Sequence, residues 1–411
     1  MIIKSDRDLD IKVGLLVYAR PEIYVGKYFK HSKSPKSFYV YEVSIDARIA
    51  DPDTLKPASI ICRNGEVVEF LLCKEGISTI DAANYASKEL KLKLTYAGLK
   101  DSEAHTCQFV RALCTSEVRL NPHYSLLDDK VRLYTIGRAS ELLFRGSLFG
   151  NYFKILLNYL GGTSEFNRVL QALDKVVNEL PKLLLPNFFG YQRFGTRRPV
   201  THLIGKAIAE CNFEEAVRYI VGYPLKTESE RVTAAREAFE RGELKESLRL
   251  FPRKFWIEKS VIRKLMRGLN PKDAVLSLSR KILKLYVEAY QAYLFNIALS
   301  TGLLECGSVE EFSRRCGVLP MPGPASSSRY IRNKYCHDLV MQVIKSSCTS
   351  TCDIDEVRKL FNKSVRPTYF RVLRPAYEVQ GSNVWLKFEL PSGSYATILL
   401  REMLRNNLVL P

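Results

Sequence analysis

Apolar and polar residues alternate along several short stretches of the chain. The alternation is clearest over residues 38–43, where every second side chain can enter a core while its neighbours face solvent. This pattern is typical of a half-buried β-strand. Comparable patterns predict further strands over residues 12–18, 67–73, 131–136, 142–144 and 384–390.

Apolar residues recur at helical spacing elsewhere. Residues 80–92 form one such segment, with Thr79 as its expected N-cap, and residues 164–180 form a second. From Pro199 to about residue 365 the chain is mainly helical in pattern. Helices are predicted there over residues 200–209, 230–241, 257–267 and 271–299. The sequence therefore places strands near both ends of the chain and helices between them.

Composition indicates a folded protein that meets a polyanion. The 411 residues are 46% hydrophobic and 11% aromatic, which suits two domains with a large core. A formal charge of +18 favours nucleic acid as the partner, although a generally basic surface without a partner remains the alternative. No apolar run approaches the ~20 residues that span a bilayer. Charged residues near the N-terminus, where a secretory segment would be apolar, predict a cytoplasmic protein without membrane attachment.

Cysteine and histidine spacing gives no sign of a metal site. The ten cysteines are spread along the chain without a Cys-x-x-Cys pair, and the five histidines are isolated from one another. Reduced, buried thiols are the default expectation, with oxidation of some of them as the alternative in a thermophile. Glycine spacing fits neither a phosphate loop nor a dinucleotide fingerprint, so we expect neither a metal nor a small-molecule cofactor.

Candidate chemistry lies between the helix at residues 80–92 and the apolar run at residues 109–113. Gly98 permits a tight turn, and Asp101 follows it among Lys100, Glu103 and His105. A carboxylate in such a turn, beside a cation, suits a nucleophile or a general base. The alternative is that Asp101 caps a helix while Lys100 is solvated.

A second candidate is the stretch that begins at Gly150. Asn151 and Phe153 are two residues apart in a predicted strand, so they point to the same face. An amide beside an aromatic ring can hydrogen-bond and stack a uracil. The alternative is a satisfied strand amide next to a core phenylalanine.

Several blocks together resemble the TruD family of tRNA pseudouridine synthases. The family pattern Ala-Gly-x-Lys-Asp-x-x-Ala-x-Thr-x-Gln occurs here without a gap, from Ala97 to Gln108. Further family blocks follow in the family's order and cover essentially the whole chain. They are Phe38-x-Val40-x-Glu42, Gly150-Asn151-x-Phe153, Asn187 to Gly195, Tyr290 to Asn296, and Gly393 to Thr397 followed by Leu400-Arg401-Glu402.

The resemblance implies roles for individual residues. In the family the aspartate of the first pattern is catalytic, so that role carries to Asp101. Substrate-binding roles carry to Phe38, Asn151, Phe153 and Tyr395, and the family's aromatic at the Tyr395 position lies against the target base. The family usually has Pro-Glu-Asp before the phenylalanine and a lysine six residues upstream of it. Here Pro35-Lys36-Ser37 precedes Phe38, Ser32 stands at the upstream position, and the neighbouring Lys33 takes the lysine's role.

The implied fold class is α+β. A catalytic domain with a mixed or antiparallel sheet of pseudouridine-synthase type would comprise residues 1–190 and 366–411. A mainly α-helical TRUD domain would be inserted at residues 191–365. The family resemblance implies a V shape with a basic cleft for tRNA, to which the insert's lysines and arginines could contribute.

The implied activity is that of an isomerase that converts a tRNA uridine to pseudouridine, and family analogy points to position 13. Asp101 can attack or stabilise the sugar carbon, or it can abstract a sugar proton to give a glycal-like intermediate. Alternatives are the same chemistry on another uridine, such as one in the anticodon, and an RNA-binding protein without catalysis. We expect a monomer, because no exposed heptad pattern is evident.

Overall fold

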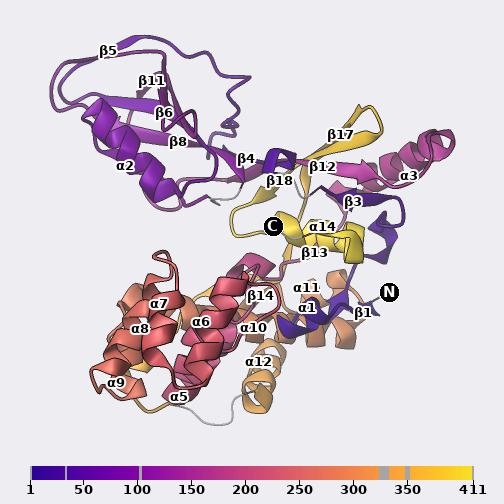
Figure 1. Ribbon diagram of the computed structural model, residues 1–411. Coiled ribbons are helices and arrows are strands. Elements are labelled where there is room, and N and C mark those ends of the chain that lie inside the picture. The colour runs from indigo at the N-terminus through magenta and orange to yellow at the C-terminus, as the bar shows by residue number, and fades with distance from the viewer. Residues whose placement is uncertain (1, 33–34, 101–103, 324–332, 348–351, 410–411) are drawn as a thin grey trace. The chain divides into compact units, whose positions relative to one another are not determined.

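The computed structural model describes residues 2–32, 35–100, 104–323, 333–347 and 352–409 (Figure 1). Two compact units are present, and each is built from separated parts of the chain. Unit 1 comprises Met1–Pro21, Leu184–Phe370 and Thr397–Glu402, and unit 2 comprises Glu22–Leu183, Arg371–Ala396 and Met403–Pro411. The domain bounds expected from the sequence, with their catalytic and inserted roles, stay a prediction.

Unit 2 is organised around a ten-stranded mixed sheet. The strand order is β10-β11-β6-β8-β4-β12-β18-β17, while β3 also pairs with β12 and β7 with β8. Strands β4 and β8 run parallel, and the other pairs are antiparallel. The strands are β3 (Phe29–His31), β4 (Phe38–Val43), β6 (Val67–Lys74), β7 (Leu94–Tyr96), β8 (His105–Leu113), β10 (His123–Leu126), β11 (Val131–Ala139), β12 (Gly150–Tyr159), β17 (Leu373–Gln380) and β18 (Asn383–Pro391).

Helix α2 (Thr79–Leu90) covers part of one face of this sheet (Figure 1). Its buried alanines and Leu90 pack against Val68, Phe70 and Leu72 of β6. The helix begins after Ser78, whose hydroxyl accepts a hydrogen bond from the Asp81 backbone N–H. The N-cap is therefore Ser78, and the prediction of Thr79 is wrong by one residue. Unit 2 also contains α3 (Phe166–Glu179) and a small antiparallel pair, β5 (Ile60–Cys62) with β9 (Val118–Leu120).

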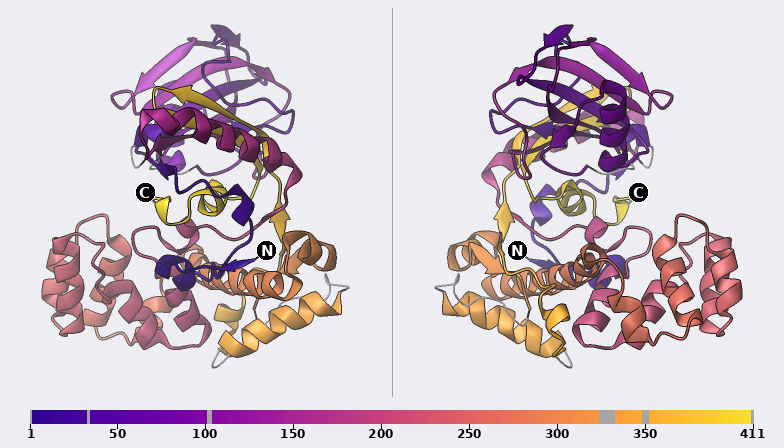
Figure 2. Two further views of the ribbon diagram at one scale, coloured as in Figure 1. Left: turned by 90° about the vertical axis from the view of Figure 1, so that its right-hand side faces the viewer. Right: turned by 90° about the vertical axis from the view of Figure 1, so that its left-hand side faces the viewer.

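Unit 1 is mainly helical, with α4, α11 and α12 packed along the 27-residue helix α10 (Figure 2). The helices are α1 (Asp8–Lys12), α4 (Thr201–Ala209), α5 (Phe213–Val221), α6 (Glu230–Glu240), α7 (Leu244–Leu250), α8 (Trp256–Met266), α9 (Pro271–Leu276), α10 (Arg280–Cys306), α11 (Val309–Arg315), α12 (Lys334–Ser347) and α13 (Asp355–Arg358), and α14 spans Ala396–Leu404. Short antiparallel pairs complete the unit: β1 (Ile3–Lys4) with β2 (Val17–Tyr18), β13 (Leu185–Pro186) with β16 (Tyr369–Phe370), and β14 (Val318–Pro320) with β15 (Val365–Pro367).

Three sequence predictions of secondary structure are wrong. Residues 142–144 form no strand, and only Val17–Tyr18 of the strand expected over residues 12–18 is extended. The single helix expected over residues 271–299 is two helices, because Ser279 precedes a new helix start at Arg280. The break is made by the non-helical backbone of Ser279, whose ψ is 142°. The α+β class itself is confirmed by the mixed sheet of unit 2 and the helices of unit 1.

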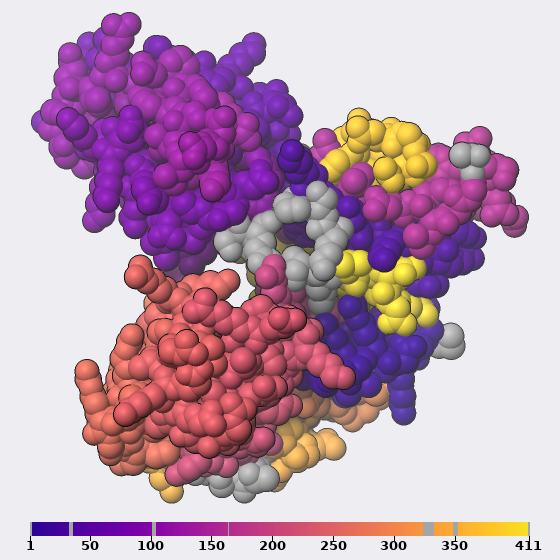
Figure 3. All heavy atoms as spheres, in the orientation of Figure 1, coloured from indigo at the N-terminus to yellow at the C-terminus, as the bar shows by residue number. Residues whose placement is uncertain are grey.

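The outer helices of unit 1 carry exposed basic residues. Helices α6 to α9, coloured salmon in Figure 3, form much of the surface that faces the viewer there. The exposed basic residues on or beside α8 and α9 are Arg253, Lys254, Arg263, Arg267 and Lys272. No helix in the described part of the chain has both the length and the apolar character needed to cross a membrane.

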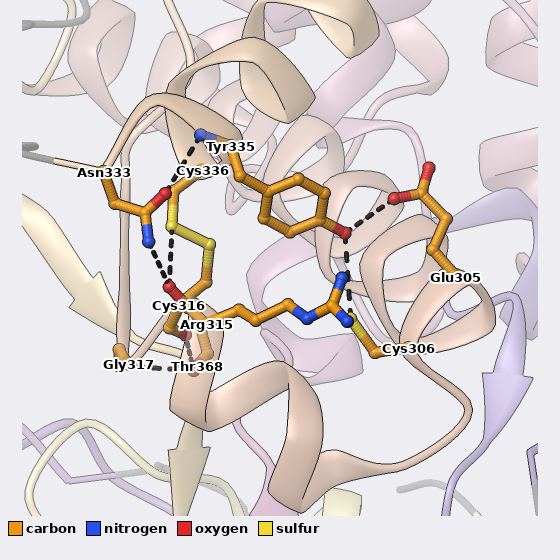
Figure 4. The surroundings of a disulfide bond; sticks show 9 residues. All are labelled: Glu305, Cys306, Arg315, Cys316, Gly317, Asn333, Tyr335, Cys336 and Thr368. Carbon is orange, nitrogen blue, oxygen red and sulfur yellow. Dashed lines mark hydrogen bonds between the residues drawn. A yellow bond between two sulfur atoms is a disulfide. The ribbon is translucent and has the colours of Figure 1, made fainter.

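The described residues form four disulfides, so the expectation of reduced thiols is wrong for these cysteines and the alternative, oxidation, holds for them. Cys62–Cys114 and Cys73–Cys107 lie in unit 2, while Cys211–Cys352 and Cys316–Cys336 lie in unit 1. Figure 4 shows the last of these, where Asn333 donates to the Arg315 carbonyl at 2.6 Å and Thr368 donates to the Cys316 carbonyl at 2.6 Å. Cys306 is unpaired, and Cys348 lies outside the described residues.

A buried ion network joins both chain ends within unit 1. Arg401 is fully buried, with its Nε 2.7 Å from Asp10 Oδ2 and one terminal nitrogen 3.2 Å from Glu402 Oε1. Glu402 accepts hydrogen bonds at 2.9 Å from the backbone N–H groups of Ala19 and Arg20. Every charge in the network has a partner, as burial in a low-dielectric interior demands.

Replacing Arg401 with Met is expected to lower the free energy of unfolding by about 3–5 kcal/mol, because it leaves two buried carboxylates without their countercharge. Urea denaturation followed by circular dichroism measures this. The control is Arg249→Met, which breaks an exposed pair with Glu246 and should leave the midpoint unchanged. Equal effects of the two substitutions would contradict a structural role for the buried network.

Candidate functional site

Three adjacent strands of unit 2 place the candidate site. In the β4–β12 register, Glu42 lies opposite Asn151 and Val40 lies opposite Phe153. Because successive side chains of a strand alternate between faces, these four residues and Phe38 share one face of the sheet. The predicted strand alternation therefore places Phe38, Asn151 and Phe153 on one face.

The backbone that leads to Asp101 is fixed by a chain of hydrogen bonds. The Lys100 backbone N–H donates to Thr79 Oγ1 at 2.9 Å, and the Thr79 hydroxyl donates to Gln108 Oε1 at 3.2 Å. Gln108 Nε2 donates in turn to the Gly98 carbonyl at 3.1 Å. Residues on both sides of the Asp101 segment are thus tied to the first turn of α2.

The Lys100 ammonium lies between two strands of this face. Its Nζ is 2.7 Å from Asn151 Oδ1 and 3.0 Å from Glu42 Oε2. The Lys100 and Glu42 side chains are only 5% and 1% exposed, so the alternative of a solvated Lys100 is wrong. A lysine has donors and no acceptor, so the amide oxygen of Asn151 must face it. The amide NH₂ of Asn151 then points away from Lys100 and is oriented to donate elsewhere.

Burial and charge act in opposite directions on Glu42. Removal from water raises its pKa above the ordinary glutamate value, while the Lys100 ammonium and the Phe109 backbone N–H oppose that rise. A carboxylate in this position stays ionised only with its cation in place. Lys100 therefore contacts both the Glu42 carboxylate of β4 and the Asn151 amide of β12. It favours the charged form of the first and fixes the orientation of the second.

Aromatic rings line the same face beside Asn151. The Phe38 and Phe153 ring centroids are 6.2 Å apart in an edge-on arrangement, and Phe153 stacks on Phe388 at 5.3 Å. Phe153 is 6% exposed, whereas Phe38 is more exposed. Phe153 therefore forms an apolar base for the site, and Phe38 presents more of its ring.

Tyr395 comes from the C-terminal part of unit 2. Pro391, the last residue of β18, pairs with Gly150 at the start of β12, and Ser392 donates its backbone N–H to the Phe149 carbonyl at 2.9 Å. The partly exposed Tyr395 follows this turn and immediately precedes α14. Its predicted contact with a base stays a prediction. Asp101 and Lys33 both lie outside the described residues.

Sequence reasoning missed the residues that support the site. Glu42 is part of the Phe-x-Val-x-Glu block. Its spacing of four residues from Phe38 in one strand places both side chains on the same face of the sheet. Its ion pair with Lys100 depends on the parallel pairing of β4 with β8, which no local pattern reveals. Thr79 and Gln108 likewise meet only after α2 has packed on the sheet.

Replacing Lys100 with Met is expected to destabilise the protein by about 3–5 kcal/mol near neutral pH, because Glu42 is left buried without its cation. Without Lys100, the pKa of Glu42 in the folded state rises further. Above the unfolded glutamate pKa of about 4.3, the folded state then binds more protons than the unfolded state. The free energy of unfolding therefore falls as the pH rises from that value towards the pKa of Glu42 in the folded state.

Urea denaturation of Lys100→Met at a series of pH values measures this slope. Lys93→Met, at an exposed lysine of the same unit, serves as the matched control and should follow the wild type. Adding Glu42→Gln to Lys100→Met should flatten the extra pH dependence. A Lys100→Met variant with the wild-type slope would show that Glu42 does not depend on Lys100.

Comparison with known proteins places the chain in one family. The family model described as tRNA pseudouridine synthase D (TruD) matches residues 13–314. A probable tRNA pseudouridine synthase D of Sulfurisphaera tokodaii is 32% identical over 357 residues, covering 84% of this chain and 86% of the relative. The probable tRNA pseudouridine synthase D of Pyrobaculum aerophilum is 30% identical over 421 aligned residues, covering 96% of both proteins.

A solved structure supports the same fold. The crystal structure of the putative tRNA pseudouridine synthase D (TruD) from Methanosarcina mazei matches with a TM-score of 0.68 at 23% identity, covering 97% of this chain and 98% of that one. This likeness confirms the expected pseudouridine-synthase type of fold. The extent of the family match and the identity to these relatives show that the chain belongs to the TruD family of tRNA pseudouridine synthases.

Proposed function

We propose that this protein isomerises a uridine of tRNA to pseudouridine, with position 13 as its target and Asp101 as the catalytic carboxylate. The N1–C1′ glycosidic bond breaks, the uracil turns, and a bond forms between C5 and C1′. The proton lost from C5 is balanced by the proton gained at N1. The proposal also holds that the enzyme acts in the cytoplasm as a monomer without a cofactor.

The observation that carries the proposal is the position of Lys100. Lys100 is joined directly to Asp101 by a peptide bond, and its ammonium contacts Asn151 at 2.7 Å. Lys100, from the motif that contains Asp101, thus contacts the motif that contains Asn151 within unit 2. The proposal assigns to this cation the role of keeping the Asp101 carboxylate ionised, as either catalytic route requires.

The other residues of this face suit an everted uracil. Taking a base out of its stack costs a few kcal/mol, and stacking on an aromatic side chain contributes about 1–3 kcal/mol in return. Phe38 and Tyr395 are the partly exposed rings assigned to that contact, over the apolar base formed by Phe153. Because Lys100 holds Oδ1 of Asn151, the amide NH₂ is the group assigned to a uracil carbonyl oxygen.

Asp101 acts by one of two routes in this proposal. It attacks or stabilises C1′ as the uracil departs, or it removes a sugar proton to give a glycal-like intermediate. Both routes need the carboxylate beside the sugar and the base held nearby while it turns. Fixing the flanks of the Asp101 segment through Thr79 and Gln108 serves that positioning.

Replacing Asp101 with Asn is expected to abolish pseudouridine formation while tRNA affinity is retained, because the amide keeps the shape and loses the charge. The fall in kcat should be at least the ~10²–10⁴-fold that a positioned acid–base group contributes. Tritium release from uracil C5 of labelled tRNA measures turnover, and filter binding measures affinity. Asp128→Asn, at an exposed aspartate of the same unit, is the matched control and should be fully active.

The same experiment separates the alternatives. A non-catalytic RNA-binding protein would bind tRNA and form no pseudouridine in either form. An active Asp101→Asn variant would remove Asp101 from the catalytic role. Chemical mapping of pseudouridine in the product, and in RNA from cells with and without the gene, identifies the uridine and tests position 13 against an anticodon site.

A further inference from the structure

The opposite face of the unit 2 sheet contains a second cluster of reactive side chains. Cys73 on β6 lies directly opposite Cys107 on β8, with 4.1 Å between their Cα atoms. His105 is two residues before Cys107, so both side chains leave the same face of β8. Gln108, the next residue, points to the face that carries Asn151, so the cluster is separate from the candidate active site.

The three side chains place their ligand atoms together. One ligand atom from each of Cys73, His105 and Cys107 lies within 4.8 Å of the other two, the single such group found in the described part of the chain. His105 Nε2 is 3.9 Å from Cys107 Sγ, and His105 Nδ1 is 3.7 Å from Glu75 Oε2. A histidine that faces a ligand site with one nitrogen and a carboxylate with the other is the usual arrangement at protein metal centres.

The cluster and the carboxylate beside it differ in their exposure to solvent. Both cysteines are buried, at 1% and 0% exposure, whereas the Glu75 side chain is 43% exposed and marks the approach from solvent.

We propose that reduction of the Cys73–Cys107 disulfide turns this cluster into a zinc site held by Cys73, Cys107 and His105, with a water as fourth ligand. A thiol or phosphine reductant supplies the two electrons, and the two sulfurs become thiols. Zinc then displaces two protons, so the two thiolates neutralise its charge. A disulfide oxidant accepts the two electrons when the two thiolates form the Cys73–Cys107 bond again, and the metal is then released.

The geometry suits tetrahedral zinc. With Zn–S bonds of about 2.3 Å, two thiolates of one tetrahedral site lie about 3.8 Å apart. The observed 3.9 Å between His105 Nε2 and Cys107 Sγ is already close to such a ligand–ligand spacing. Reduction of their bond lets the two sulfurs separate towards the thiolate–thiolate spacing. Arg132 lies directly opposite Cys73 in the β11–β6 register, so a positively charged residue neighbours the two sulfurs.

Cobalt(II) titration of the full chain tests the site. The protein is reduced anaerobically with a phosphine, which is then removed, and cobalt(II) is followed by its tetrahedral d–d and thiolate charge-transfer bands. We expect one tetrahedral cobalt per chain at a site that zinc displaces, and no such site before reduction. His105→Ala and the pair Cys73→Ser, Cys107→Ser should each abolish the bands, while Glu75→Gln should weaken binding about tenfold.

The pair Cys62→Ser, Cys114→Ser is the matched control, because it removes the other disulfide of unit 2, which has no histidine in a ligand group. This control should keep the bands. The proposal is overturned if reduced wild-type protein shows no tetrahedral cobalt, or if the bands survive the Cys73 and Cys107 substitutions. Circular dichroism of each variant confirms that a lost signal does not reflect unfolding.

Discussion

The buried ammonium of Lys100 holds the candidate site together. It contacts a carboxylate on β4 and an amide on β12, and its own residue precedes Asp101. A buried ion pair contributes little net stability, because desolvation of both charges offsets their attraction, but the loss of one partner is severe. Lys100 therefore acts mainly by positioning, because its ammonium fixes the orientation of the Asn151 amide.

The period of two residues along β-strands gives the sheet two chemically different faces. On one face, Glu42, Asn151 and Phe153 combine a charge, an oriented amide and an apolar base. On the other face, the Cys73–Cys107 disulfide lies beside the His105 imidazole. Because Cys107 and Gln108 are adjacent on β8, the same strand serves both faces. A change in β8 register would displace both sites at once.

The sequence predicted much of this arrangement where the signal was local. Alternation located β4, β6 and β18, and helical spacing located α2, α4 and α8 to within a few residues. The family motifs selected Asn151 and Phe153, which the structure brings together with Phe38. Other predictions failed: residues 142–144 form no strand, and one long predicted helix is interrupted near Ser279.

Long-range pairing was the part that local patterns could not supply. Glu42 meets Lys100, and Cys73 meets Cys107, only because β8 lies between β4 and β6 in the sheet. The sequence contains each residue but not the strand order that makes them neighbours. For the same reason the buried state of Lys100 was missed, since its spacing beside Asp101 and Glu103 equally suits a solvated loop.

A crystal structure of the Asp101→Asn protein bound to uridine-containing tRNA tests the central claim most directly. The account predicts an everted uracil that accepts a hydrogen bond from the NH₂ of Asn151, while Lys100 keeps its contacts with Asn151 Oδ1 and Glu42. A uracil bound away from Asn151, or a Lys100 side chain withdrawn into solvent while the base is bound, would contradict it.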